Sequence, residues 1–86
     1  MADKPEVSPG QRIRFGTETA VVCYVYTDST DGDCYIVYLE EGEAIGISVK
    51  WTGKSWDVAH QGDLGIHANT RSDLRPFVDI LRRRLS

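Results

Sequence analysis

The residues best suited to chemistry in this chain are aromatic and acidic side chains that fall near one end of a predicted sheet. Trp51 and Trp56 flank a short turn, and an acidic loop spans residues 28–33. Aromatic rings bordered by carboxylates are typical of sites that bind a cationic group. The sequence therefore predicts a small-molecule or cationic-ligand site made of Trp51, Trp56, Asp28, Asp31, Asp33, Tyr26 and Tyr35. The alternative is core packing, which is the commoner role of paired aromatic residues on strands, with the aspartates favouring a solvated turn.

The sequence offers no recognisable metal-binding or catalytic motif. The D-x-x-D-G-D loop lacks the spacing of an EF-hand, and Leu39 stands where the closing glutamate would be. Cys23, Cys34, His60 and His67 are scattered and show neither C-x-x-C nor H-x-x-x-H spacing. No G-x-S-x-G segment marks a nucleophile. We therefore expect no metal, no cofactor and no catalytic residue.

Charge is distributed unevenly along the chain. The net charge is −3, but the segment from Arg71 onward carries +3 and the preceding seventy residues carry −6. A cluster of basic residues, Arg82, Arg83 and Arg84, is a candidate phosphate-binding site. Because an isoelectric point near 5.2 is unlike that of a typical nucleic-acid binder, helix-end charge complementarity is the simpler explanation. Nucleic-acid binding is therefore only a second alternative.

These residues are positioned by a predicted meander of strands from Ala20 to Ala59. A tight turn at residues 41–42 sets Glu40 opposite Glu43, and a second turn at residues 53–54 sets Trp51 opposite Trp56. Both turns place the same alternating side chains on one apolar face. A shift of one residue in either register would destroy that agreement. The pattern therefore predicts three antiparallel strands with a defined core face.

The first hairpin of the meander has a longer loop, which allows more than one register. Pairing Val25 with Ile36 would place Val21, Cys23 and Val25 on the same core face. In that register Cys23 and Cys34 lie about four residues apart along the sheet, which is too far for a disulfide. We therefore expect both cysteines to be reduced.

The opposite face of the meander is also apolar. It is predicted to carry six large residues on the first two strands and three small ones on the third: Val22, Tyr24, Tyr26, Tyr35, Val37, Leu39, Ala44, Gly46 and Ser48. A sheet with one wet face would be polar there. We therefore expect a covering element, and the small residues would allow a helix to lie close to the sheet.

The flanking segments supply further elements. Ile13 and Phe15 alternate with polar residues in an edge strand, and Ile66 is predicted to point inward from a short closing strand over residues 64–68. A helix over residues 73–85 follows from apolar residues at helical spacing, namely Leu74, Phe77, Val78, Leu81 and Leu85. Thr70, Ser72 or Asp73 can cap it, and Pro76 favours Asp73 because proline is tolerated only in the first turn.

These observations predict a mainly β protein: a small SH3-like antiparallel barrel of about five strands with a C-terminal amphipathic helix. Residues 1–10 are expected to be a flexible tail and residues 11–86 one domain. The predicted function is a non-catalytic protein-interaction module, with a homodimer or another protein as the partner and an interface that includes Tyr24, Tyr26, Val37 and Leu39. We expect no membrane association, because no apolar run is long enough, and a cytoplasmic location.

Overall fold

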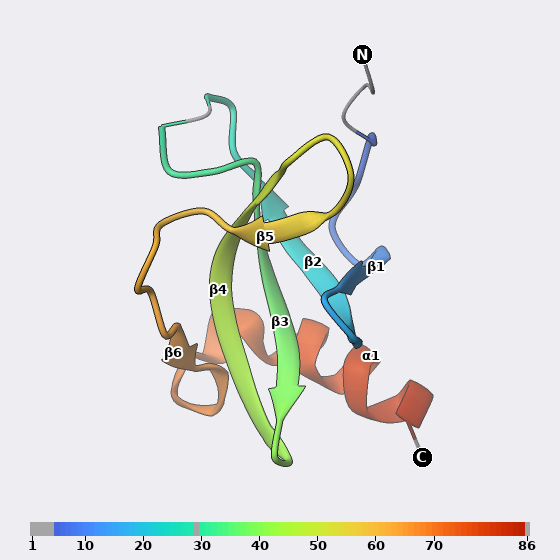
Figure 1. Ribbon diagram of the computed structural model, residues 1–86. Helices are drawn as coiled ribbons and strands as arrows, with labels where there is room; N and C mark the ends of the chain where they lie inside the picture. The colour runs from blue at the N-terminus through green and yellow to red at the C-terminus, as the bar shows by residue number, and fades with distance from the viewer. Residues whose placement is uncertain (1–4, 29, 86) are drawn as a thin grey trace.

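The protein is a mostly β domain with one C-terminal helix (Figure 1). The computed structural model describes residues 5–28 and 30–85, with side chains as far as residue 83. Strands β1 to β5 form a closed sheet, in which each strand pairs antiparallel with the next. The prediction of an antiparallel arrangement fails at the closure, because β5 returns to β1 through a parallel pair, Phe15 with Trp56. The strands are β1 (Arg12–Phe15), β2 (Glu18–Val25), β3 (Cys34–Glu40), β4 (Glu43–Trp51), β5 (Trp56–Val58) and β6 (Ile66–His67). The short β6 pairs with Ile45 and Gly46 near the start of β4 and is not one of the five strands of the closed sheet.

The predicted registers of the second and third hairpins are confirmed. Glu40 pairs with Glu43, and every pair between β3 and β4 follows from there. The turn residues Glu41 and Gly42 both have positive φ, 52° and 84°, as a two-residue turn of this kind requires. Trp51 pairs with Trp56 between β4 and β5.

The predicted register of the first hairpin is wrong. Val25 pairs with Cys34, and Val22 pairs with Ile36. The register changes between Val22 and Tyr24, so Cys23 is the extra residue of a β-bulge. A bulge adds one residue to one strand and reverses the alternation of faces beyond it, which the sequence pattern did not signal. Val21 and Cys23 therefore lie on the face opposite to the predicted one.

Each face of the sheet packs a separate core. The interior of the closed sheet holds seven buried residues: Ala20, Val22, Cys34, Ile36, Ile47, Val49 and Trp56. The outer face of β2, β3 and β4 packs against the C-terminal segment in a second cluster: Val21, Cys23, Tyr35, Val37, Ala44, Ala68, Leu74, Val78 and Leu81. Helix α1 (Arg75–Leu85) thus supplies the predicted cover, and Figure 1 shows it behind the lower part of the sheet.

Helix α1 begins two residues later than predicted. Two short 3₁₀ turns, η1 (Ala68–Thr70) and η2 (Ser72–Leu74), lead into it. Asp73 lies within η2 and its carboxylate pairs with Arg71, so it is not the N-cap of the helix. Pro76 is the second residue of α1, where a missing N–H leaves no helical bond unmade. The side chain of Leu85 lies outside the part that the structure describes.

Two other flanking segments contact the sheet. In residues 5–10, Val7 packs against the interior cluster, and the N–H of Gly10 donates to the carbonyl of Val22 at 2.7 Å. Residues 1–4 of the predicted tail lie outside the described residues. Ile66 is 43% exposed and does not point inward as predicted, because it pairs with Gly46, which lies beside Val37 on the outer face.

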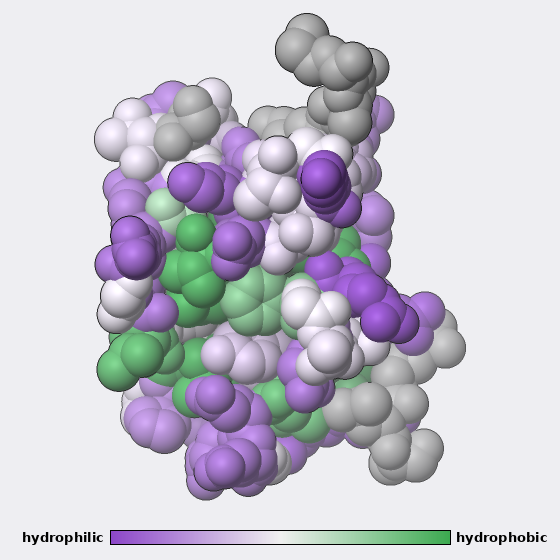
Figure 2. All heavy atoms as spheres, viewed as in Figure 1, coloured by the Kyte–Doolittle hydropathy of each residue, from purple (hydrophilic) through white to green (hydrophobic). Residues whose placement is uncertain are grey.

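Some large apolar side chains also reach the surface, among them Tyr24, Val25, Leu64 and Ile66. Figure 2 shows hydrophobic residues gathered in the middle of the face toward the viewer, surrounded by hydrophilic ones. Phe15 and Tyr38 are partly buried against the interior cluster, with ring centroids 5.1 Å apart. No helix within residues 5–28 and 30–85 is long and apolar enough to cross a membrane.

Candidate functional site

Three tyrosines meet on the outer face of the sheet, at the end that α1 does not cover. The rings of Tyr24 and Tyr35 are stacked, with centroids 5.1 Å apart and planes 1° apart. Tyr26 meets the ring of Tyr24 edge-on, with centroids 5.3 Å apart. The bulge at Cys23 brings Tyr24 opposite Tyr35 and places both rings on the outer face. We call Tyr24, Tyr26, Tyr35 and Ile66 the tyrosine surface.

Small residues on β4 make room for these rings. A Cβ atom at Gly46 would lie 2.6 Å from the Tyr35 hydroxyl oxygen, so only glycine lets the Tyr35 ring lie over β4. Ser48, two residues along, shares a hydrogen bond of 2.7 Å between its hydroxyl and that of Tyr26. Ile66 pairs with Gly46 from the other side and extends the same face. The tyrosine surface therefore runs across β2, β3, β4 and β6.

Solvent exposure separates this surface from the part covered by α1. Tyr24 and Ile66 are 39% and 43% exposed, whereas Val37 is fully buried under the helix. Leu39 is also partly buried against the cluster that includes α1. Of the four predicted interface residues, Tyr24 and Tyr26 thus lie on the open part of the face, and Val37 is inaccessible to a partner.

Charged residues border the tyrosine surface. The positive charge of Arg71 lowers the pKa of both Tyr24 and Tyr35, and the negative charge of Asp63 raises the pKa of Tyr35. Burial raises the pKa of Tyr24 above its ordinary value, with Tyr26 adding to the effect and Arg71 opposing it. The Arg71 guanidinium pairs with Asp73 through two hydrogen bonds, one of them 2.9 Å from Nε to Oδ1. The border of the surface thus carries both signs of charge.

The structure brings only some of the residues predicted to form a ligand site together: Asp33 lies beside Trp51 and lines a hollow with Trp56. Trp51 and Trp56 meet edge to face, with centroids 5.3 Å apart, and they pack with the interior cluster. Tyr26 and Tyr35 belong to the cluster on the opposite face. Trp56 is buried, and the indole N–H of Trp51 is buried without a hydrogen-bond partner among the described residues. The tryptophan pair therefore lies apart from the two tyrosines.

The aspartates of the acidic loop have structural contacts. The Asp33 carboxylate accepts the backbone N–H of Trp51 at 2.7 Å, which ties the start of β3 to the end of β4. The Asp28 carboxylate accepts the N–H of Thr30 at 2.9 Å. Hydrogen bonding to the backbone and side chain of Thr30 lowers the pKa of Asp28. Asp31 is exposed. Within the described ranges, no group of three or more metal-ligating side chains comes together.

The predicted arginine cluster is also divided by the helix. Arg82 lines a hollow between η1 and α1 and donates to the carbonyl of Gly42 at 3.3 Å, whereas Arg83 borders a different part of the helix surface. Successive residues of a helix point about 100° apart, so they do not form one binding group. The side chain of Arg84 lies outside the described residues.

The sequence indicated Tyr24, Tyr26 and Tyr35 but gave no reason to include Arg71 or Ile66. Arg71 lies 36 residues from Tyr35 along the chain, and only the fold of η1 and η2 brings it near. The surplus of arginines from Arg71 onward was the available signal, since it suggested contact with an acidic partner.

A search of protein-family models, curated proteins and solved structures finds no significant match to this chain.

Proposed function

We propose that this protein is a non-catalytic interaction module that self-associates through the tyrosine surface. The observation that carries the proposal is that Tyr24 remains 39% exposed on a face whose other half is buried by α1. Tyrosine has a large apolar body and a hydroxyl that can stay hydrated, and it is enriched at protein interfaces. A partner on this surface would complete the cover that the helix begins.

The charges around the surface favour a second copy as that partner. A two-fold interface places the same patch on both subunits, so the patch must be complementary to itself. Arg71 lowers the pKa of Tyr35 and Asp63 raises it, so this side of the surface carries one charge of each sign. A two-fold arrangement can set Arg71 of one copy opposite Asp63 of the other. Each opposite-sign pair at the rim would fix orientation more than it would add affinity.

The size of the surface points to weak association. Four residues on one end of a small sheet bury far less than the roughly 1,600 Å² of a stable complex. We therefore expect a dimer that forms reversibly in the micromolar range or above. Another protein with an aromatic and mixed-charge surface is the alternative partner.

The test is sedimentation velocity of the full chain across a concentration series from micromolar to millimolar. The wild-type protein should show a concentration-dependent shift from monomer to dimer. Tyr24→Glu should remain monomeric, because it places a charge in the contact. Circular dichroism and urea unfolding should show that Tyr24→Glu keeps its fold, since the interior core does not include Tyr24.

Val25→Glu is the matched control. The substitution introduces the same charge at the next residue of β2, which is similarly exposed, at 41%. Val25 lies on the other face of the sheet, opposite Cys34. This variant should dimerise as the wild type does. A wild-type chain that stays monomeric at millimolar concentration would refute self-association, and equal loss of the dimer in both variants would refute the assignment to the tyrosine surface.

Two further proposals accompany this one. We propose that the closed five-stranded sheet is an SH3-like barrel, supported by its consecutive hairpins and by the return of β5 to β1.

A cytoplasmic location is also proposed, supported by two buried thiols on opposite faces of the sheet that are not bonded to each other. Fractionation of the source cells would test the second proposal.

A further inference from the structure

A second candidate site lies at the corner where η1 and η2 lead into α1. A hollow of about 460 Å³ opens there between residues 68–72 and the outer side of the helix. Buried Ala68 and Val78 lie at its base. The residues around it carry more positive than negative charge, with Arg71, Arg75 and Arg82 against Asp79.

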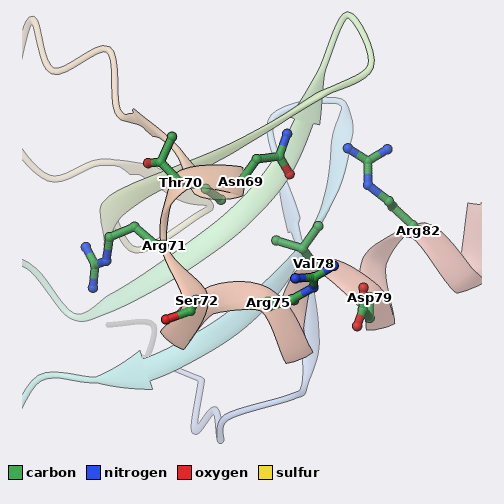
Figure 3. A pocket seen from close by; sticks show the side chains of 9 residues that line it. Asn69, Thr70, Arg71, Ser72, Arg75, Val78, Asp79 and Arg82 are labelled. Atoms are coloured by element: carbon green, nitrogen blue, oxygen red, sulfur yellow. The ribbon is translucent and has the colours of Figure 1, made fainter.

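Three hydrogen-bond donors enter this hollow from two elements. Figure 3 shows the Asn69 amide and the Arg82 guanidinium turned toward one another across the gap, with Arg75 beside Val78. Arg75 and Arg82 are seven residues apart on α1, which is two helical turns and places them on the same side. Arg71 points away from this gap in Figure 3 and pairs with Asp73. The central donors are therefore Asn69, Arg75 and Arg82.

The arginines have unused hydrogen-bonding capacity. Among the residues that the structure describes, the Arg75 guanidinium makes no hydrogen bond or ion pair. Arg82 uses one N–H for the long bond of 3.3 Å to the Gly42 carbonyl, which holds its side chain beside the hollow. A guanidinium has five N–H donors arranged to match the oxygens of carboxylate and phosphate. Two such groups and an amide are suited to a multiply charged oxyanion.

We propose that this hollow binds the phosphate group of a small phosphate monoester. The volume exceeds what inorganic phosphate alone would fill, and the apolar base formed by Ala68 and Val78 can contact an organic part of the ligand. Asp79 on the rim repels a second phosphate and can accept a hydrogen bond from a ligand hydroxyl. Only Arg71 borders both this hollow and the tyrosine surface, and it is not one of the central donors, so the inference does not depend on self-association.

A nucleic-acid strand fits the same features less well. A polymer needs a basic track that follows successive phosphates, and the first seventy residues carry a net charge of −6. Gly42, the backbone partner of Arg82, sits between Glu41 and Glu43 in an acidic turn. Negative charge beside the hollow would oppose an extended polyanion and would tolerate one small dianion.

The test is a ¹H–¹⁵N NMR titration of the full chain with inorganic phosphate and with phenyl phosphate, at constant ionic strength balanced by sodium chloride. Saturable shifts are expected at the amides of Asn69, Ser72 and Val78 and at the Arg75 Nε–H. Phenyl phosphate should bind several-fold more tightly than inorganic phosphate, because its ring can contact the apolar base. Equal affinity for the two probes would overturn the assignment to an organic monoester.

Three variants make the test specific. Arg75→Gln should weaken phenyl phosphate binding by about tenfold or more, since it removes a charge-assisted donor. Asp79→Asn should strengthen binding, because it removes a like charge beside the phosphate. Arg14→Gln on β1 changes net charge equally but lies away from the hollow, so it should leave binding unchanged.

Several outcomes would refute the proposal. Shifts that follow ionic strength rather than phosphate concentration would mean that no site exists. Equal weakening by Arg75→Gln and Arg14→Gln would mean that only overall charge matters. An oligonucleotide that competes far better than phenyl phosphate for the same amides would mean that the hollow serves a polymer.

Discussion

Tyr24 and Tyr35 stack with their ring planes 1° apart, although Tyr24 follows directly after a residue that disrupts the pairing of its strand. The bulge at Cys23 is what makes this possible. In a regular ladder Tyr24 would share a face with Val22, which lies in the interior of the sheet. The extra residue turns the end of β2 so that three tyrosines gather on the outer face. The same irregularity thus creates the tyrosine surface and ends the regular part of the hairpin.

Replacing Gly46 by alanine should lower the free energy of unfolding by about 1–3 kcal/mol, because the new Cβ would overlap the Tyr35 ring. The direction of this change is informative, because glycine in a strand is otherwise less stable than alanine, so the substitution would stabilise the strand if the contact were absent. Urea unfolding measures the change. Thr19→Ala, at an exposed position of β2, should alter stability by no more than about 0.5 kcal/mol.

Removing the Tyr35 hydroxyl should relieve part of that overlap. The oxygen is the nearest atom at 2.6 Å, but ring carbons at 2.9 and 3.0 Å would remain. In the Tyr35→Phe background, Gly46→Ala should therefore cost less than it does alone, without becoming neutral. Strict additivity of the two changes would contradict the contact described between Gly46 and Tyr35.

Asp33→Ala should destabilise the protein by about 1.5–3 kcal/mol, because it leaves the backbone N–H of Trp51 without its charged acceptor. The bond ties the acidic loop to the end of β4, so tryptophan fluorescence should also change. Asp31→Ala removes the same charge from an exposed position of the same loop and should be nearly neutral. If both variants lose equal stability, the bond to Trp51 contributes nothing specific.

Alkaline pH should destabilise the fold through Cys23. Burial raises the pKa of the Cys23 thiol from its ordinary value of 9.0 to about 12, with a smaller contribution from Asp73. Between these values the unfolded chain loses the thiol proton and the folded chain keeps it, so the free energy of unfolding falls as pH rises. This contribution is fully present below pH 9.0 and is lost as pH approaches about 12.

Urea unfolding at several alkaline pH values measures the slope. The free energy of unfolding of Cys23→Ala should fall less steeply with pH than that of the wild type, and the difference in slope should correspond to one titrating proton. Tyr24 and Tyr35 also have pKa values raised by burial, so some decline should persist in the variant. Identical slopes for the two proteins would show that the thiol does not titrate differently on unfolding.

Arg71→Gln should affect association more than stability. The pair with Asp73 is solvent-exposed at both partners, with side chains 38% and 58% accessible, and such pairs contribute about 0–1 kcal/mol to folding. The variant should therefore unfold near the wild-type urea concentration and dimerise more weakly in sedimentation. A dimer unaffected by Arg71→Gln and by added salt would exclude Arg71 from the interface.

Much of the fold follows from local signals in the sequence. The turns at residues 41–42 and 53–54 fix the pairing of β3, β4 and β5, because a tight turn leaves only one register that keeps one apolar face continuous. The helix likewise follows from apolar spacing. The first hairpin could not be predicted in this way, since its long loop allows several registers and nothing in the residues around Cys23 marks a bulge.

The residue types and their spacing were enough to predict that both faces of the meander are apolar and that the C-terminal segment is an amphipathic helix. How much of the second face the helix buries depends on the three-dimensional packing. The helix packs with Val21, Val37 and Leu39 in one cluster and leaves Tyr24 partly exposed, and the segment before it folds into η1 and η2. The positions of Arg71, Arg75 and Arg82 likewise depend on contacts between distant segments, which no local pattern encodes.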